Sequence, residues 1–159
     1  MKKLFLTLAL LPLMAIAGNV KSPNGNIELK FSVDNTGRPV YEMSYKGRAV
    51  VKPSFLGLEL AKDKHASAGM DEKDLMDQFS IVNEKVSEFD ETWQPVWGET
   101  KNIRNHYNEL AVTLQQMWLE RVKSNKPGVQ LAPKQHRREM IIRFRVYDDG
   151  IGLRYEFPQ

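Results

Sequence analysis

The sequence predicts an all-β fold, an antiparallel β-sandwich. Three observations indicate this class. Apolar and polar residues alternate in several short segments, turn-forming residues separate these segments, and no segment keeps a sustained helical period. Short antiparallel strands joined by tight turns favour a sandwich over an α/β fold.

The first part of the chain predicts a meander of three strands. In residues 27–33, apolar side chains alternate with polar ones, as in a half-buried strand. Asp, Asn and Gly suit the turns that reverse the chain, because they tolerate the backbone angles that tight turns need. The predicted strands are 27–33, 40–45 and 49–51, and the predicted turns are 22–26, 34–37 and 46–47.

Pro53 is expected to interrupt the third strand, because proline cannot donate a hydrogen bond to a β-ladder. Leucines at alternate positions of 56–60 then resume a strand pattern. Residues 61–78 are charged, small and aperiodic, which predicts a loop with a short helix at 71–76.

The second part predicts strands at 79–86, 110–114, 140–147 and 151–157. Asp148-Asp149-Gly150 is typical of the turn between the last two. Residues 118–139 predict an irregular region. Its basic cluster of Lys134, His136, Arg137 and Arg138 is interpreted as a solvated loop in preference to a phosphate or lipid site.

The first residues predict a secretory signal peptide. Lys2 and Lys3 precede an apolar run at 4–16, which closes on the small-x-small pattern Ala15-Ile16-Ala17. The expected organisation is therefore a signal peptide at 1–17 and one β-sandwich domain at 18–159, located in the periplasm or secreted. No other segment approaches the roughly 18 apolar residues of a spanning helix, so no membrane span is expected.

Composition excludes several functions. The chain has no cysteine, which removes disulfides, thiolate metal sites and thiol catalysis. The signal takes two of the 23 Lys and Arg residues, leaving 21 against 20 Asp and Glu, so no nucleic-acid partner is expected. His65, His106 and His136 lack metal-ligand spacing, and neither a Gly-x-Ser-x-Gly elbow nor a glycine-rich phosphate loop is present.

Residues 89–109 are the densest polar and aromatic region. Sugars offer C–H faces that stack on aromatic rings and hydroxyls that suit Asn, Glu and Arg, so this mixture is typical of a glycan-contacting surface. The competing interpretation is that the tryptophans fill the space between the sheets. The candidate contact residues are Trp93, Trp97, Glu99, Arg104, Asn105, His106 and Asn108.

The carboxylates of this region could in principle supply a glycosidase pair. Such a pair needs a defined separation across the glycosidic bond, and the sequence gives none. The carboxylates considered are Asp90, Glu91, Glu99 and Glu109. The residues alone therefore do not identify a catalytic pair.

Three segments carry a family resemblance: 89–99 (FDETWQPVWGE), 103–110 (IRNHYNEL) and 148–158 (DDGIGLRYEFP). They resemble the amino-terminal domain of glycoside hydrolase family 97, the calcium-dependent α-glucosidases and α-galactosidases of Bacteroidetes type. Residues 22–25 and 56–60 also resemble it. Two departures are the long basic stretch at 118–139 and Leu153, which stands where an aromatic core residue is common.

The resemblance implies a galactose mutarotase-like β-super-sandwich that packs against a (β/α)8 catalytic barrel and helps to wall its active site. It implies that the catalytic carboxylates and most or all calcium ligands lie after residue 159. This fragment is then expected to hold no cofactor and to be inactive alone, whereas the full-length enzyme is expected to hold calcium. The implied partners are the downstream barrel and an α-linked oligosaccharide.

Two other functions stay open from the residues. The first is a free-standing exported carbohydrate-binding module, which the aromatic and polar cluster at 89–109 would suit. The second is the product of a degraded gene that does not fold, because a surface meant to pack on a barrel would be left exposed. The chain stops directly after an alternating strand, so we expect that it is truncated before the barrel.

Overall fold

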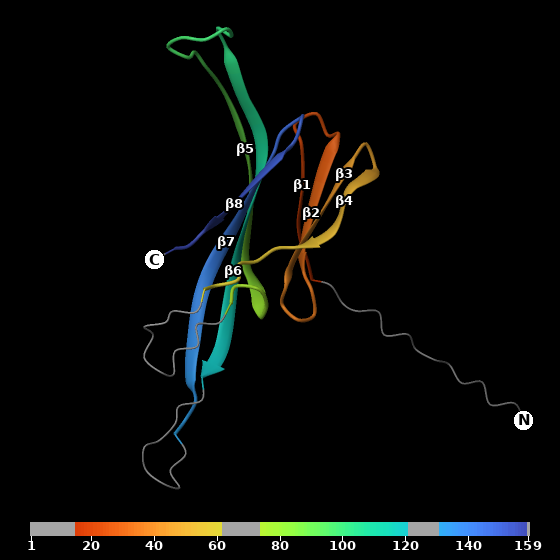
Figure 1. Cartoon of the computed structure of the whole chain (residues 1–159). Coiled ribbons are helices and arrows are strands. Elements are labelled where there is room, and N and C mark those ends of the chain that lie inside the picture. The colour runs from red at the N-terminus through yellow and green to blue at the C-terminus, as the bar shows by residue number, and fades with distance from the viewer. Residues whose placement is uncertain (1–14, 62–73, 121–130, 159) are drawn as a thin grey trace, which may run out of the picture.

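A computed structural model describes residues 15–61, 74–120 and 131–158, and these residues form two four-stranded antiparallel sheets (Figure 1). The first sheet contains β1 (Ala15–Lys21), β2 (Ile27–Val33), β3 (Pro39–Tyr45) and β4 (Arg48–Phe55). The second contains β5 (Phe79–Trp93), β6 (Ile103–Glu120), β7 (Lys134–Val146) and β8 (Ile151–Glu156). Spatial order follows chain order in both sheets. The predicted all-β sandwich is confirmed.

The described residues form no helix, so none of them provides a helical membrane span. The turns follow local chemistry. Lys46 and Gly47 both have positive φ, 48° and 77°, as the tight β3–β4 turn requires. In the β2–β3 turn, the Asp34 carboxylate accepts hydrogen bonds from the backbone N–H groups of Thr36 and Arg38, each at 2.9 Å. These bonds hold the pKa of Asp34 well below its ordinary value despite the opposing effect of burial.

The core lies between the sheets. Phe31 of β2 and Phe144 of β7 are fully buried, with ring centroids 5.7 Å apart, and Tyr41 of β3 lies 6.1 Å from Phe144. Alternate residues of each strand supply this core because side chains of a strand point to opposite faces in turn. The buried core residues are Val20, Ile27, Leu29, Phe31, Val33, Leu75, Phe79, Leu110, Val112, Leu114, Met140, Ile142, Phe144 and Val146.

β1 is a strand that the sequence analysis did not predict. It pairs with β2, and Val20 joins the core. The pairs from Asn19↔Lys30 to Lys21↔Glu28 follow the predicted cleavage position, so a chain beginning at Gly18 would keep them. Gly18 has a φ of 25°, and a Cβ there would lie 2.6 Å from the Leu110 side chain, which explains the glycine at this crossing.

Three predictions in the middle of the chain are wrong. β4 continues through Pro53 to Phe55. β4 is an edge strand, and its register on β3 shifts near Pro53. The missing N–H of the proline therefore costs no hydrogen bond between the strands. Residues 56–60 form no strand; Leu58 exchanges backbone hydrogen bonds with Leu75 alone, each at 3.0 Å. Of the predicted helix at 71–76, residues 74–76 are not helical and 71–73 lie outside the described residues.

The prediction of an irregular region at 118–139 is wrong for residues 118–120 and 134–139, which are strand. Trp118 belongs to β6, and the basic cluster belongs to β7, while 121–130 lie outside the described residues. His136 stacks on Trp118 with ring centroids 5.0 Å apart, and the Arg138 guanidinium lies 5.0 Å from the same ring. The cluster is therefore divided between the two faces of a strand instead of forming a solvated loop. Leu153, interpreted as a core residue, is 40% exposed.

Candidate functional site

The second sheet is much longer than the first, and one end of it projects alone (Figure 1). β5 and β6 pair from Phe79↔Gln116 to Trp93↔Ile103, whereas β6 and β7 pair no further than Asn108↔Val146. Residues 89–107, called the arm below, are therefore a two-stranded ribbon that β7 does not support. All seven candidate contact residues lie on the arm or, for Asn108, at its base.

The two faces of the arm differ in character. Alternate residues share a face, so Arg104, His106 and Asn108 continue the face on which Leu110 is buried. We call this the inner face, and it points to the side of the first sheet. Cross-strand neighbours in an antiparallel pair also share a face. The outer face accordingly carries Phe89, Glu91, Trp93, Ile103, Asn105 and Tyr107.

The inner face is held together by polar contacts within the chain. The Arg104 guanidinium donates two hydrogen bonds to the Asp90 carboxylate, at 2.8 and 2.7 Å. These bonds lower the pKa of Asp90 below its ordinary value. His106 Nε2 lies 3.3 Å from a carboxylate oxygen of Glu88. Three polar cross-links thus run along this face, including that of Asn108 described next.

Asn108 ties the base of the arm to the first sheet. Its side-chain amide donates a 2.8 Å hydrogen bond to the backbone carbonyl of Lys21 in β1. Because Arg104, His106 and Asn108 already have partners within the chain, a sugar hydroxyl would have to compete with those partners. The inner face therefore suits stiffening of the arm better than ligand capture.

The outer face carries an aromatic cluster at the base of the arm. Phe89 stacks on Tyr107 with ring centroids 5.1 Å apart, and Tyr147 lies 5.2 Å from Tyr107 on the other side. The Arg145 guanidinium covers Tyr107 at 4.6 Å. Tyr107 is buried as a result, although it points away from the sandwich core.

The tip of the arm is open to solvent. Trp97 is 89% exposed and Trp93 is 46% exposed, and Val96 and Glu99 are exposed as well. Gln94 and Asn102 close the loop with a 2.9 Å hydrogen bond between their side-chain amides. In this chain the two tryptophans do not fill the space between the sheets, so the packing interpretation is wrong here.

Residues 20–159 match the family described as Glycosyl-hydrolase 97 N-terminal. The chain belongs to this family. Its fold is similar to that of a family 97 enzyme from Pseudoalteromonas sp. strain K8 solved with acarbose, with 27% identity and a TM-score of 0.66. A variant of that enzyme solved with panose matches equally well. A β-arabinopyranosidase has 22% identity and a TM-score of 0.62, which supports the fold alone.

This family 97 domain is short beside its solved relatives. Each of these matches covers 89% of the chain but only 18% of the relative's chain. The described strands therefore correspond to less than a fifth of those proteins.

Outside the aromatic cluster, the outer face of the family 97 domain carries an ion network that the sequence analysis missed. Glu109 of β6 accepts hydrogen bonds from Arg143 and, at 2.9 Å, from Arg145, both of β7. Glu156 of β8 accepts two from Arg143, at 2.8 and 2.9 Å, and one from Arg154 at 2.7 Å. The alternation of charged residues in the sequence, at Arg143 and Arg145 and at Arg154 and Glu156, was the signal that could have predicted this network.

The arginines of the network lower the pKa of its two carboxylates. Hydrogen bonds from Arg143 and then Arg154 lower the pKa of Glu156 to about 2, against the opposing effect of burial. Burial raises the pKa of Glu109, but the hydrogen bonds from Arg145 and Arg143 outweigh it, so this pKa also lies below its ordinary value. A general acid needs a raised pKa, so Glu109 is suited to structure and not to proton donation.

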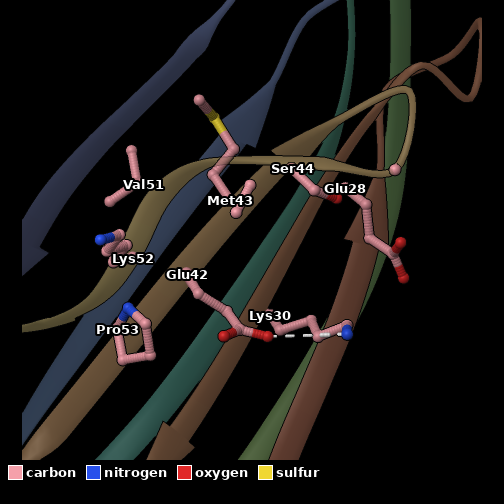
Figure 2. Close-up of a pocket in the computed structure, with 10 residues that line it drawn as sticks. Glu28, Lys30, Glu42, Met43, Ser44, Val51, Lys52 and Pro53 are labelled. Atoms are coloured by element: carbon pink, nitrogen blue, oxygen red, sulfur yellow. Dashed lines mark ion pairs between the residues drawn. The ribbon is translucent and has the colours of Figure 1, made fainter.

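No metal site emerges from the described residues. Among them, no three His, Asp or Glu side chains converge as a metal ion would need, so the calcium implied for the full-length enzyme has no fitting donor set there. The first sheet carries a hollow of about 300 Å³. Lys30 and Glu42, which line it, form an ion pair of 3.6 Å (Figure 2). This hollow is open, and both charges of its ion pair are about half exposed.

Proposed function

We propose that the chain is the amino-terminal, non-catalytic sandwich domain of an exported family 97 glycoside hydrolase. The parent enzyme is an α-glucosidase or α-galactosidase that acts on α-linked oligosaccharides. The match of residues 20–159 to the family carries this proposal. The 18% coverage of the related enzymes supports a front domain, and the acarbose and panose complexes of the Pseudoalteromonas enzyme support the substrate class.

In this proposal the domain supports the downstream (β/α)8 barrel and forms part of the wall of its active site. The barrel supplies the catalytic carboxylates and the calcium site. The domain contributes a β scaffold, and arginines neutralise Glu109 and Glu156 on its outer face. A signal peptide at 1–17 would place the enzyme in the periplasm or outside the cell.

The test begins with the genomic DNA beyond the codon for Gln159. An open frame that encodes a barrel would be expressed, and its hydrolysis of α-glucosides and α-galactosides would be measured with and without a calcium chelator. We expect activity that the chelator abolishes, and no activity from residues 1–159 alone. A stop codon after Gln159 in several independent isolates would contradict the proposal.

A free-standing exported carbohydrate-binding module is the second candidate. The 89% exposure of Trp97 beside the partly exposed Trp93 favours it, because exposed aromatic rings stack on sugar faces. Calorimetric titration of the chain with maltooligosaccharides and galactosides measures this directly. Absence of binding at millimolar ligand, which corresponds to less than about 4 kcal/mol of binding free energy, would exclude it.

A further inference from the structure

Gly18 is the point at which β1 leaves its regular pairing with β2. The ladder between these strands skips Gly18, because its register shifts between the pairs of Ala17 and Asn19. Gly18 has a φ of 25°, and a Cβ there would lie 2.6 Å from the Leu110 side chain of β6. β1 therefore passes tightly against the second sheet at the residue that follows the predicted cleavage position.

The backbone nitrogen of Gly18 bonds to β5 instead of β2. Its N–H donates a 2.8 Å hydrogen bond to a carboxylate oxygen of Glu84. Glu84 lies opposite Val112 of β6, so it is on the face of the second sheet that points toward the first. Within residues 15–61, 74–120 and 131–158, no Lys, Arg or His side chain forms an ion pair with Glu84. Its partner there is a neutral amide.

Cleavage after Ala17 turns this amide into an amine. Hydrolysis of the peptide bond adds one water molecule, so Ala17 leaves with a carboxylate and the nitrogen of Gly18 becomes the amino terminus. An α-amino group has an ordinary pKa of about 7.7 to 8.0, so it is mostly protonated at pH 7. We propose that this α-ammonium group forms an ion pair with Glu84 and holds β1 of the mature domain on β5. The inference rests on the proposed function, which includes the signal peptide at 1–17.

The pair would give the mature terminus a contact that it otherwise lacks. Cleavage removes the β1–β2 pairs of residues 15–17 and leaves those from Asn19 to Lys21. Chain ends are poorly ordered unless they are tied down. An ammonium group donates charge-assisted hydrogen bonds, which are stronger than those of a neutral amide. Glu84 is exposed and Gly18 is partly exposed, so the effect should be modest and local.

Other charged groups surround the new terminus, because β1 contacts β2, β5 and β6. Those on these elements and on β1 near Gly18 are Lys21, Glu28, Lys30, Glu84, Lys85, Glu88, His106 and Glu109. Glu88 shares the face of Glu84 but lies 3.3 Å from His106, and Lys30 pairs with Glu42. In this part of the described structure, Glu84 is the group bonded to the Gly18 nitrogen.

Export of residues 1–159 from a bacterial host with their own first 17 residues tests the proposal. The intact mass of the exported protein should match a chain that begins at Gly18. With 13C-labelled glycine, an NMR titration of Gly18 at 0.15 M salt then measures the pKa of the amino terminus. We expect Glu84→Gln to lower this pKa by about 0.2 to 0.7, because exposed ion pairs contribute about 0.2 to 1 kcal/mol and one pKa unit corresponds to about 1.36 kcal/mol.

Glu88→Gln is the matched control. It removes a carboxylate from the same face of β5, but from one that contacts His106. At this salt concentration distant surface charges are screened, so the pKa of the amino terminus should change by less than about 0.1.

The possible results separate the ion pair from export. Cleavage after Ala17 with an unchanged pKa in Glu84→Gln would overturn the pair and leave export intact. An equal decrease in Glu84→Gln and Glu88→Gln would also overturn it, because the effect would come from net charge. Cleavage at another bond would overturn it too, since Gly18 would not be the terminus. A chain that kept residues 1–17 would refute the exported status in the proposed function together with the pair.

Discussion

β5 and β6 pass through two environments, the sandwich and the arm, with the same alternation of side chains. Within the sandwich, the inner face of β6 carries Leu110, Val112 and Leu114, which are fully buried against the first sheet. Two residues earlier on the same face the side chains become polar, at Asn108, His106 and Arg104. The inner face is apolar where the first sheet covers it and polar beyond that sheet.

The outer face changes in another way. Along the sandwich it carries the arginine and glutamate network, and along the arm it carries Phe89, Trp93 and Ile103 with the polar pair Glu91 and Asn105 between them. Both faces therefore change character near Asn108. In the free chain, stability should come from the sandwich, and the arm should contribute little. The predictions below test this division.

Removal of a core ring should have the largest effect. Phe144 is fully buried between Phe31 and Tyr41, whereas Trp97 is 89% exposed on the arm. We expect Phe144→Ala to lower the free energy of unfolding by about 3 to 5 kcal/mol, because it deletes buried contacts and leaves a cavity. Trp97→Ala, an aromatic deletion of similar size, should change it by less than about 0.5 kcal/mol. Urea denaturation measures both, and equal losses would refute the division.

The junction between the first sheet and β5 should give the next largest effect. Gly37 has a φ of 79°, and a Cβ there would lie 2.6 Å from backbone atoms of Gln78 and Phe79. We expect Gly37→Ala to cost about 2 to 5 kcal/mol, the sum of left-handed backbone strain and a steric clash. Gly25 is the matched control, because its φ is 73° and its Cβ would meet nothing within 4 Å.

Gly25→Ala should therefore cost only the backbone term, about 1 to 2 kcal/mol. Thermal or urea unfolding of the two variants gives the difference. A Gly37→Ala protein as stable as Gly25→Ala would show that β5 does not lie against the β2–β3 turn.

The outer-face network should give an intermediate effect that depends on pH. Glu109→Gln leaves Arg145 without a carboxylate on a half-buried surface and leaves Arg143 with Glu156 alone, so we expect a loss of about 1 to 3 kcal/mol at pH 7. The folded pKa of Glu109 lies below its ordinary 4.5, and that of Glu156 is about 2. The network's stabilisation is therefore complete above about pH 4.5 and is lost as pH falls through the folded pKa values.

Urea unfolding between pH 7 and pH 2.5 measures this dependence. The unaltered chain should lose stability below about pH 4.5, and Glu109→Gln should lose less over the same range. Parallel curves for the two proteins would show that Glu109 carries no part of the acid sensitivity.

Much of the sandwich could be predicted from sequence because its signals are local. The alternation at 27–33 predicted β2, and Lys46-Gly47 predicted the β3–β4 turn. β1 was missed because its small residues resemble a signal-peptide end and its pairing with β2 lies outside any local pattern. The strand predicted before Pro53 was too short. An edge strand tolerates proline, and only the sheet order shows that β4 is an edge strand.

The candidate site was predicted as a segment but not as a surface. The sequence grouped Trp93, Trp97 and Arg104, and the structure places them on one arm. It could not separate the faces, because this requires the register of β5 on β6. It also could not predict that the tryptophans are exposed, because exposure depends on how far the first sheet extends.

The smallest global effect should come from the inner-face pair of the arm. Asp90→Asn weakens the pair with Arg104, and we expect no measurable change in the urea midpoint because both side chains are exposed. The change should be local: backbone amides of the arm should exchange with solvent faster, since the ribbon loses one of its few cross-links. Glu42→Gln is the matched control. It breaks the similarly exposed Lys30–Glu42 pair, but β3 has neighbours on both sides, so exchange in β3 should stay unchanged. Hydrogen exchange followed by NMR separates the two cases. If Asp90→Asn lowered the midpoint, the arm would be unfolding together with the core, and stability could no longer be divided at Asn108.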